Sequence, residues 1–390
     1  MSAGVSADEN LAELTDEQRA LVETAEQFAT EKIAPDAVEW DREHHFPVDV
    51  LRDAAKLGMA GLYVAEDVGG TGLTRMEAVL VFEALATGCP SVAAYLSIHN
   101  MVAAMIDRHG DDDQRQRWLP GLCSMDELAS YCLTEPDAGS DAAALRTTAE
   151  RDGDGYRLNG VKQFISGAGT SDRYLVFART GGPGAGGISA FVVPRGATGL
   201  RFGPDEQKMG WNAQPTRQVV FDDVGVPGTD RLGDEGGGFR IAMSGLDGGR
   251  LNIAACSLGG ARAALDRAME HLATRSAFGA PLADRQALRF TVADAHTDLT
   301  AARLLLHRAA RAADAGERDA TRLCAMAKRL ATDTGHAVAD TALQLHGGYG
   351  YLAEYGIEKI VRDLRVHKIL EGTNEVMRVI VSRGLMGAEK

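Results

Sequence analysis

Glu371 is the residue of this sequence best suited to acid–base chemistry. It follows the apolar pair Ile369-Leu370 and directly precedes Gly372. A carboxylate among apolar neighbours resists ionisation, because burial disfavours its charged form and raises its pKa toward neutral pH. Glu371 is therefore a candidate general base. The competing interpretation is a surface glutamate in a loop, since most glutamates are exposed.

The residues around Glu371 indicate how it is held. Gly372 predicts a tight loop, and Thr373 is a suitable cap for a helix that begins just after it. The apolar face of that helix is expected to contain Val376, Val379, Ile380 and Leu385. The candidate base thus precedes a C-terminal helix.

The periodicity of apolar residues divides the rest of the chain into three parts. Capping boxes at Thr15–Gln18 and Thr74–Glu77 open helices in a first part that reads as entirely helical. Long alanine-rich helices at 239–273, 283–313 and 318–345 predict a bundle in the last part. We predict an α+β fold with an N-terminal helical domain (1–126), a middle β domain (127–235) and a C-terminal helical bundle (236–390).

The middle part has the period of two that is typical of strands. Asn159-Gly160 predicts a hairpin turn between two strands, and further strands are expected at 174–178, 188–193 and 218–221. Frequent Gly and Pro between them favour an antiparallel sheet or small barrel. Gly182 to Gly187 satisfies G-x-G-x-x-G, but a strand follows it where a dinucleotide fingerprint needs a helix, so we reject a Rossmann site.

Composition limits the class of protein. The chain has 390 residues, a formal charge of −14 and 5 cysteines that stand singly in apolar surroundings. The charge opposes general binding to nucleic acid or anionic membranes, and no run reaches membrane-spanning length. Scattered cysteines and a polar, acidic first segment without an export signal favour a reduced, cytoplasmic protein without a metal site.

Three motifs in order resemble the acyl-CoA dehydrogenase family. They are Tyr131-Cys-Leu-Thr-Glu-Pro-Asp-Ala-Gly-Ser-Asp141, Gln344-Leu-His-Gly-Gly-Tyr-Gly-Tyr351 and Glu371-Gly-Thr373. The resemblance covers nearly the whole chain and implies the same order of helices, sheet and helices. One departure is Ala65, where relatives often have proline. Within the family the resemblance is strongest to members that oxidise isobutyryl-CoA, for example across Gly210 to Arg217 and Leu246 to Ala254.

The resemblance implies an FAD-dependent α,β-dehydrogenation, of isobutyryl-CoA to methacrylyl-CoA in valine breakdown. Glu371 would take the α-proton while flavin N5 receives hydride from the β-carbon. Some relatives carry the base where this chain has Gly249, and a glycine cannot transfer a proton. The alternative substrates are short straight-chain or 2-methyl-branched acyl-CoAs. A catalytically silent CoA-binding protein and an acyl-CoA oxidase are the other classes considered.

The resemblance also implies two sets of binding residues. The cofactor set is Cys132, Leu133, Thr134, Gly139, Ser140, Asp141, Phe164, Ile165, Ser166, Arg275, Arg285, Gln286, Gln344, Leu345, His346, Gly347, Gly348, Thr373, Asn374 and Glu375. The substrate set is Ser140, Asp247, Gly248, Gly249, Arg250 and Arg383. An electron-transfer flavoprotein is the implied electron acceptor. The implied assembly is a homotetramer, a dimer of dimers in which neighbouring subunits share the FAD contacts.

Overall fold

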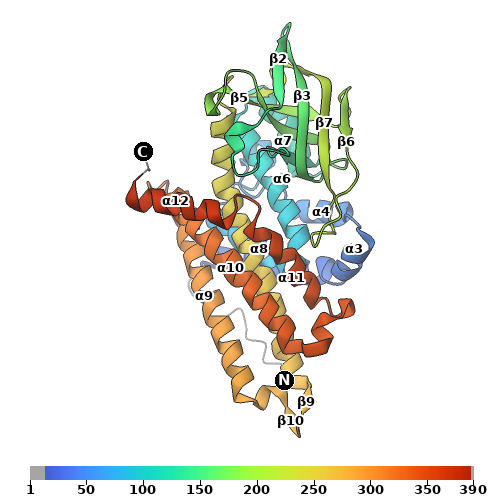
Figure 1. Cartoon of the computed structure of the whole chain (residues 1–390), viewed down its shortest axis with the longest axis vertical. Helices are drawn as coiled ribbons and strands as arrows, with labels where there is room; N and C mark the ends of the chain where they lie inside the picture. Colours follow the sequence, from blue (N-terminus) through green and yellow to red (C-terminus); the bar gives the residue numbers. More distant parts are fainter. Residues whose placement is uncertain (1–13, 388–390) are drawn as a thin grey trace.

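The computed structural model describes residues 14–387. Its first region is helical, as predicted, and Figure 1 shows it packed beside the upper half of the long yellow helix α8. The capping boxes at Thr15 and Thr74 are both formed, which fixes the first residues of two helices. The helices are α2 (Asp16–Phe28), which runs into the π-helical turn η1 (Ala29–Ile33), then α3 (Ala37–Glu43), α4 (Val48–Ala55), α5 (Arg75–Ala86), α6 (Pro90–His109) and α7 (Asp112–Cys123).

The middle region is a sheet with the strand order β6-β7-β3-β2-β4-β5-β8, and β1 pairs with β4. Its strands are β1 (Ala129–Cys132), β2 (Thr148–Asp152), β3 (Gly155–Ser166), β4 (Arg173–Arg179), β5 (Ile188–Pro194), β6 (Leu200–Phe202), β7 (Thr216–Pro227) and β8 (Arg231–Leu232). Most pairs are antiparallel, as expected. However, β1, which directly follows the helical region, and β2 both pair with β4 in parallel.

The hairpin predicted at Asn159-Gly160 is wrong. These two residues lie inside β3, and the turn between β2 and β3 occurs at Asp152–Gly155. The register of β3 against β7 shifts between Leu158 and Gly160, which identifies a bulge. A Cβ on Gly160 would collide with Thr147, so glycine is needed here for close packing. Gly160 does mark an unusual backbone conformation, but that conformation belongs to a bulge within β3 and not to a turn between two strands.

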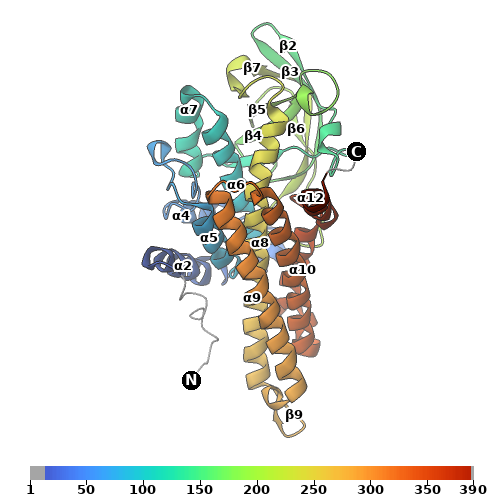
Figure 2. The same cartoon turned by 90° about the vertical axis from the view of Figure 1, so that its left-hand side faces the viewer.

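The last region is a bundle of long helices, as predicted. Figure 2 shows α8 (Gly238–Thr274), α9 (Gln286–Asp314) and α10 (Ala320–His346) side by side, with the short hairpin of β9 (Ser276–Ala277) and β10 (Ala280–Pro281) at their far end. The shorter helices α11 (Ile357–Arg365) and α12 (Asn374–Met386) follow. Helix α8 reaches from the sheet to the tip of the bundle (Figure 1), so it connects both ends of the molecule.

Helix α12 buries only part of the apolar face that its sequence predicts. Val379 is 43% exposed and Leu385 is 68% exposed, whereas Met377 and Asn374 are buried. Val376 and Ile380, the other two residues of the predicted face, are half-buried. The predicted apolar face is therefore only partly covered within the single chain.

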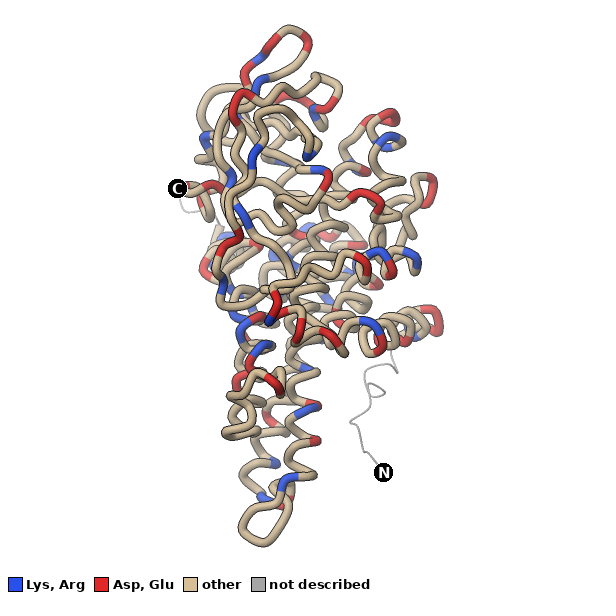
Figure 3. Tube along the Cα trace, turned by 90° about the vertical axis from the view of Figure 1, so that its right-hand side faces the viewer, with Lys and Arg blue, Asp and Glu red and all other residues tan. Residues whose placement is uncertain are grey.

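The surface is mixed in charge. Figure 3 shows acidic residues spread over the helices, the sheet and the bundle, so the net charge of −14 is not gathered in one place. No helix in the described part of the chain is long and apolar enough to cross a membrane.

Candidate functional site

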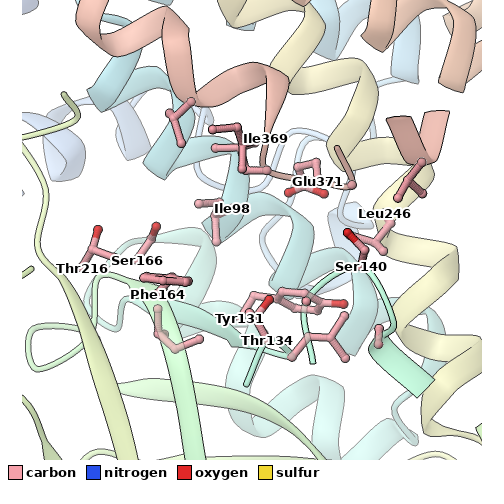
Figure 4. A pocket seen from close by; sticks show the side chains of 18 of the residues that line it. Ile98, Tyr131, Thr134, Ser140, Phe164, Ser166, Thr216, Leu246, Ile369 and Glu371 are labelled. Carbon is pink, nitrogen blue, oxygen red and sulfur yellow. The ribbon is translucent and has the colours of Figure 1, made fainter. Parts of the chain in front are cut away.

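A cavity of about 600 Å³ lies where the sheet, α6, α8 and the loop before α12 meet. Figure 4 shows Glu371 on one side of it, with Phe164 and Ser166 across the space and Tyr131 and Thr134 below. Residues from six separate sequence segments therefore come together, at 98–101, 131–143, 164–166, 208–216, 239–250 and 362–376. The predicted site residues that line the cavity are Leu133, Thr134, Gly139, Ser140, Asp141, Phe164, Ile165, Ser166, Arg250 and Glu371.

The backbone around Glu371 turns its carboxylate toward α8. Glu371 has a φ of 56°, which is uncommon for a residue with a side chain, and Gly372 follows with a φ of 85°. The Thr373 hydroxyl then accepts a hydrogen bond from Val376 N at 3.2 Å and caps α12, as predicted. A Cβ on Gly249 would lie 2.6 Å from Glu371 Oε2, so the carboxylate rests directly against the backbone of α8.

The environment of Glu371 gives it the protonation behaviour of a base near neutral pH. Its Oε2 atom is buried and has no hydrogen-bond partner. Burial raises the Glu371 pKa to about 7, while the charges of Arg250 and Lys328 pull in the opposite direction. An ionised carboxylate with an unsatisfied oxygen inside a cavity can accept a proton from a bound molecule.

Lys328 is a contributor that sequence reasoning missed. It lies on the buried side of α10 and donates to Gly372 O at 2.7 Å and to Asn374 Oδ1 at 3.0 Å. Burial lowers its pKa to about 8, and Glu371 opposes that shift. The sequence signal that could have identified Lys328 is a lysine at a position of a bundle helix whose neighbours are apolar residues and alanines. A lysine is rarely buried at such a position without a partner.

A second group of buried side chains supports the loop that carries Glu371. Trp211 Nε1 donates to His367 Nε2 at 3.3 Å, and His367 Nδ1 lies 2.6 Å from Ser257 Oγ. Burial lowers the His367 pKa to about 3, so the imidazole stays neutral and serves as a fixed hydrogen-bonding bridge. The carboxylate of Asp363 accepts from Trp211 N at 2.6 Å. These contacts tie the residues before Glu371 to helix α8 and to the segment between β6 and β7.

The opposite wall of the cavity is held by a buried ion pair. Lys162 Nζ lies 2.8 Å from Glu135 Oε1 and donates to Leu133 O at 3.1 Å. The Lys162 side chain is fully buried, so the pair is shielded from water. It joins β3 to the turn after β1. Two residues further along β3, Phe164 has a φ of 58° and is 63% exposed, with its ring in the cavity.

The other predicted cofactor residues lie at a different place. Arg275, Gln344, Leu345, His346, Gly347 and Gly348 line a second cavity of about 680 Å³ at the C-terminal end of α10. His346 stacks on His271 there, with ring centroids 4.7 Å apart. A Cβ on Gly347 or Gly348 would meet nothing within 4 Å, so this backbone is open to a ligand. One chain therefore carries two separate parts of the predicted cofactor site.

Several predicted residues line neither cavity. Cys132 is fully buried in the sheet core, and Arg285 uses its guanidinium to bond Ala277 O and Phe278 O. Asp247 pairs with Arg250 at 2.6 Å, and Arg250 in turn lines the main cavity. The remaining residues outside both cavities are Gln286, Gly248, Gly249, Thr373, Asn374, Glu375 and Arg383, of which Gln286, Glu375 and Arg383 are exposed.

Comparison with known proteins gives the class. Family models for the N-terminal, middle and C-terminal domains of acyl-CoA dehydrogenase match residues 15–126, 130–224 and 236–386. The chain belongs to the acyl-CoA dehydrogenase family, which makes it a flavin oxidoreductase of a family that uses FAD. The predicted class, cofactor and three-part fold are thereby confirmed.

Two relatives and one solved structure show which members of the family this chain is similar to. The chain is 54% identical to isobutyryl-CoA dehydrogenase of Bos taurus over 96% of this chain and 90% of that protein. It is 51% identical to isobutyryl-CoA dehydrogenase of Dictyostelium discoideum over 95% and 90% of the two chains. The solved structure of butyryl-CoA dehydrogenase from Megasphaera elsdenii has a TM-score of 0.93 at 38% identity, covering 96% of this chain and 99% of that one. The first two relatives are mitochondrial by name, so they lend no support to a cytoplasmic location.

Proposed function

We propose that this chain oxidises isobutyryl-CoA to methacrylyl-CoA, the step that the sequence resemblance associates with valine breakdown. The identity of more than half to two isobutyryl-CoA dehydrogenases supports the substrate. The observation that carries the mechanism is Glu371 itself, a carboxylate with a buried, unpartnered Oε2 and a pKa near 7 inside the main cavity.

The main cavity fits a flavin ring. It is walled by an exposed aromatic side chain, Phe164, and by the hydroxyl-bearing residues Thr134 and Ser166. A Cβ on Gly139 would meet nothing within 4 Å, which leaves its backbone accessible. We assign the flavin contacts to the residues between Leu133 and Asp141 and to Phe164–Ser166. When bound, FAD supplies the acceptor for the hydride that leaves the β-carbon.

Glu371 performs the proton transfer in this scheme. The α-proton of a thioester is weakly acidic, so its removal requires a base held close to the α-carbon and shielded from water. Burial makes the carboxylate basic enough to act near neutral pH, and Arg250 and Lys328 keep a substantial fraction of it ionised. Gly249 leaves room for the carboxylate, and therefore for a branched α-carbon beside it.

The second cavity supports sharing of FAD between subunits. Its open Gly347-Gly348 backbone and Arg275 suit the diphosphate or adenine portion of a cofactor, yet they are separated from the Glu371 cavity within one chain. We infer that a neighbouring subunit contributes this portion, within a homotetramer of paired dimers. Sedimentation of the flavin-loaded protein as a monomer would contradict this arrangement.

The test of the proposed function is anaerobic flavin reduction by a panel of acyl-CoA thioesters. The wild-type protein is expected to bleach most efficiently with isobutyryl-CoA, with graded activity on butyryl- and 2-methylbutyryl-CoA, because one methylene changes discrimination by about 10–200-fold. Glu371→Gln retains the side-chain size and the flavin but loses the base. Its reduction rate should fall by about 10²–10⁴-fold. Normal bleaching by Glu371→Gln would remove Glu371 from the mechanism.

The electron acceptor is a separate proposal. Reduced flavin must be reoxidised, and we propose an electron-transfer flavoprotein as the acceptor. Reduced protein should then persist for long periods in air and lose its electrons quickly when an electron-transfer flavoprotein is added. Rapid oxygen consumption would instead identify an acyl-CoA oxidase.

A further inference from the structure

Trp211 has a backbone conformation that its neighbours must maintain. Its φ of 59° lies in the left-handed region, which is unfavourable for a residue with a side chain. Both of its N–H groups are bound by one segment of the chain. The backbone N–H donates to Asp363 Oδ1 at 2.6 Å, and the indole N–H donates to His367 Nε2 at 3.3 Å. The strained residue is therefore held by the same segment that leads to Glu371.

The hydrogen bonds around His367 can run in only one direction. An indole N–H is a donor only, so His367 Nε2 is the unprotonated nitrogen that accepts it. The neutral ring then carries its proton on Nδ1 and donates it to Ser257 Oγ at 2.6 Å, and the Ser257 hydroxyl donates onward to Ile253 O at 2.9 Å. Burial and the nearby Lys328 and His336 lower the pKa of the ring, which keeps it neutral. A protonated ring would turn a second N–H toward the indole N–H and lose that bond.

Trp211 also forms part of the wall of the main cavity. Its side chain is buried in a small core cluster. Three partly buried residues packed against this cluster line the main cavity together with Trp211; they are Ile98, Val366 and Leu370. Figure 4 shows Ile98 pointing into the same space as Glu371. A connected set of side chains thus reaches from the bonds of His367 to the space that Glu371 faces.

We propose that His367 is a positioning residue that fixes the Trp211 wall and the Glu371 carboxylate relative to each other, and that it does so as the neutral Nδ1–H tautomer. This inference rests on the proposed role of Glu371 as the base. The bond to Ser257 on α8 holds the segment four residues before Glu371, and the bond to the indole holds the wall. Without His367 the loop and the wall shift independently, and water reaches the carboxylate.

The experiment compares His367→Leu with His99→Leu in the flavin-loaded protein. His99 is a matched control, because it is also fully buried and joins two backbone groups. Its Nδ1 accepts from Ala129 N at 3.1 Å, and its Nε2 lies 2.9 Å from Leu122 O. Both variants should therefore lower the melting temperature, whereas only His367→Leu should disturb the base.

Two kinetic effects are expected in His367→Leu. The limiting rate of flavin reduction should fall about 10²-fold, the loss typical of a misplacement of about 1 Å. The rising limb of kcat/KM against pH should move below its wild-type position near pH 7, because burial is the main cause of the raised Glu371 pKa and hydration of the carboxylate reverses it. In His99→Leu the limb should stay in place.

A second readout needs no substrate. The chain has 3 tryptophans, Trp40, Trp118 and Trp211, so protein labelled with 5-fluorotryptophan gives one fluorine NMR resonance for each, and Trp211→Phe assigns the third by its loss. The Trp211 resonance should shift and broaden in His367→Leu and should not move in His99→Leu. His367→Gln, whose amide oxygen can accept from the indole N–H, should lie closer to the wild type in both readouts.

Flavin content per chain and the thermal unfolding curve report whether each variant is folded. If His367→Leu does not retain flavin, Ser257→Ala removes only the far bond of the imidazole and should give smaller changes of the same kind. An unmoved Trp211 resonance or an unmoved pH limb in the flavin-loaded variant, or equal changes in His99→Leu, would overturn the proposal. Normal flavin reduction by Glu371→Gln would instead refute the proposed base, and the fluorine measurement separates the two failures because it involves no turnover.

Discussion

Replacing Gly249 by alanine tests the contact between α8 and the proposed base. The added Cβ would lie 2.6 Å from Oε2, 2.8 Å from Cδ and 2.9 Å from Oε1 of Glu371, all closer than the 3.4 Å at which ordinary van der Waals contact begins. The carboxylate must retreat by about 0.8 Å to reach that distance, because helix backbone is harder to move than the end of a side chain. The whole carboxyl group is therefore displaced from its position in the cavity.

A displacement of this size has a calculable effect on rate. Misplacing a catalytic group by about 1 Å can cost about 10²-fold, which corresponds to about 2.7 kcal/mol of activation free energy. Stability should not fall in parallel, since alanine is about 1 kcal/mol more favourable than glycine inside a helix. We expect Gly249→Ala to keep its flavin and its melting temperature while flavin reduction by isobutyryl-CoA slows about 100-fold in anaerobic stopped-flow measurements.

Gly384→Ala is the matched control. Gly384 also lies within a helix, and its added Cβ would meet only the flexible side chain of Arg322, at 2.8 Å from Cδ. This variant should reduce its flavin at the wild-type rate. If Gly249→Ala does so as well, the carboxylate can move away without consequence, and the reasoning that Gly249 sets the position of the base is refuted.

Three further predictions follow from the charges around the site. Burial raises the Glu371 pKa to about 7, so kcat/KM should increase with pH as the base ionises. The value should be about one-tenth of its limit at pH 6 and about nine-tenths at pH 8. A flat pH profile would contradict this. The contribution of Glu371 to folding stability depends on pH in the opposite sense. The folded state binds a proton at Glu371 that the unfolded state, with its ordinary carboxyl pKa, does not hold, and the stability this proton contributes is lost as pH rises through 7. Lys328→Met removes a charge that lowers the Glu371 pKa, so the rising limb should move to higher pH, whereas a purely structural role would change the melting temperature and leave the limb in place. Lys162→Met leaves Glu135 buried without its cation and should reduce the free energy of unfolding by about 3–5 kcal/mol, measured by chemical denaturation with Lys56→Met, at an exposed ion pair, as the control.

Local sequence signals predicted a large part of the fold. The capping boxes at Thr15 and Thr74 and the cap at Thr373 were predictable because a cap involves only residues within one turn of each other. The long helices were predictable for the same reason, since their apolar period is repeated over many turns. Glu371 could be selected because its motif, a carboxylate after two apolar residues and directly before Gly372, is visible in the sequence itself.

Other features depend on contacts between distant segments. The glycine at 160 indicated an unusual backbone, but only the pairing of β3 with both β2 and β7 makes it a bulge instead of a turn. The parallel pairing of β1 with β4 likewise depends on how the helical region delivers the chain to the sheet. Strand register and direction are decided by burial against partners far along the chain, which local propensity does not encode.

The site shows the same division. The sequence by itself determined that Glu371 is a candidate base and that Gly249 cannot replace it, because these are properties of single residues and their motifs. Only the tertiary structure brings Lys328 to the loop of Glu371 from 43 positions away along the chain, and only it joins Trp211 to His367. It also separates the predicted cofactor residues into two cavities, of which only the second is lined by α10. The pKa of a base and the shape of a pocket depend on which distant groups share one small, water-poor volume, and that is settled when the helices pack.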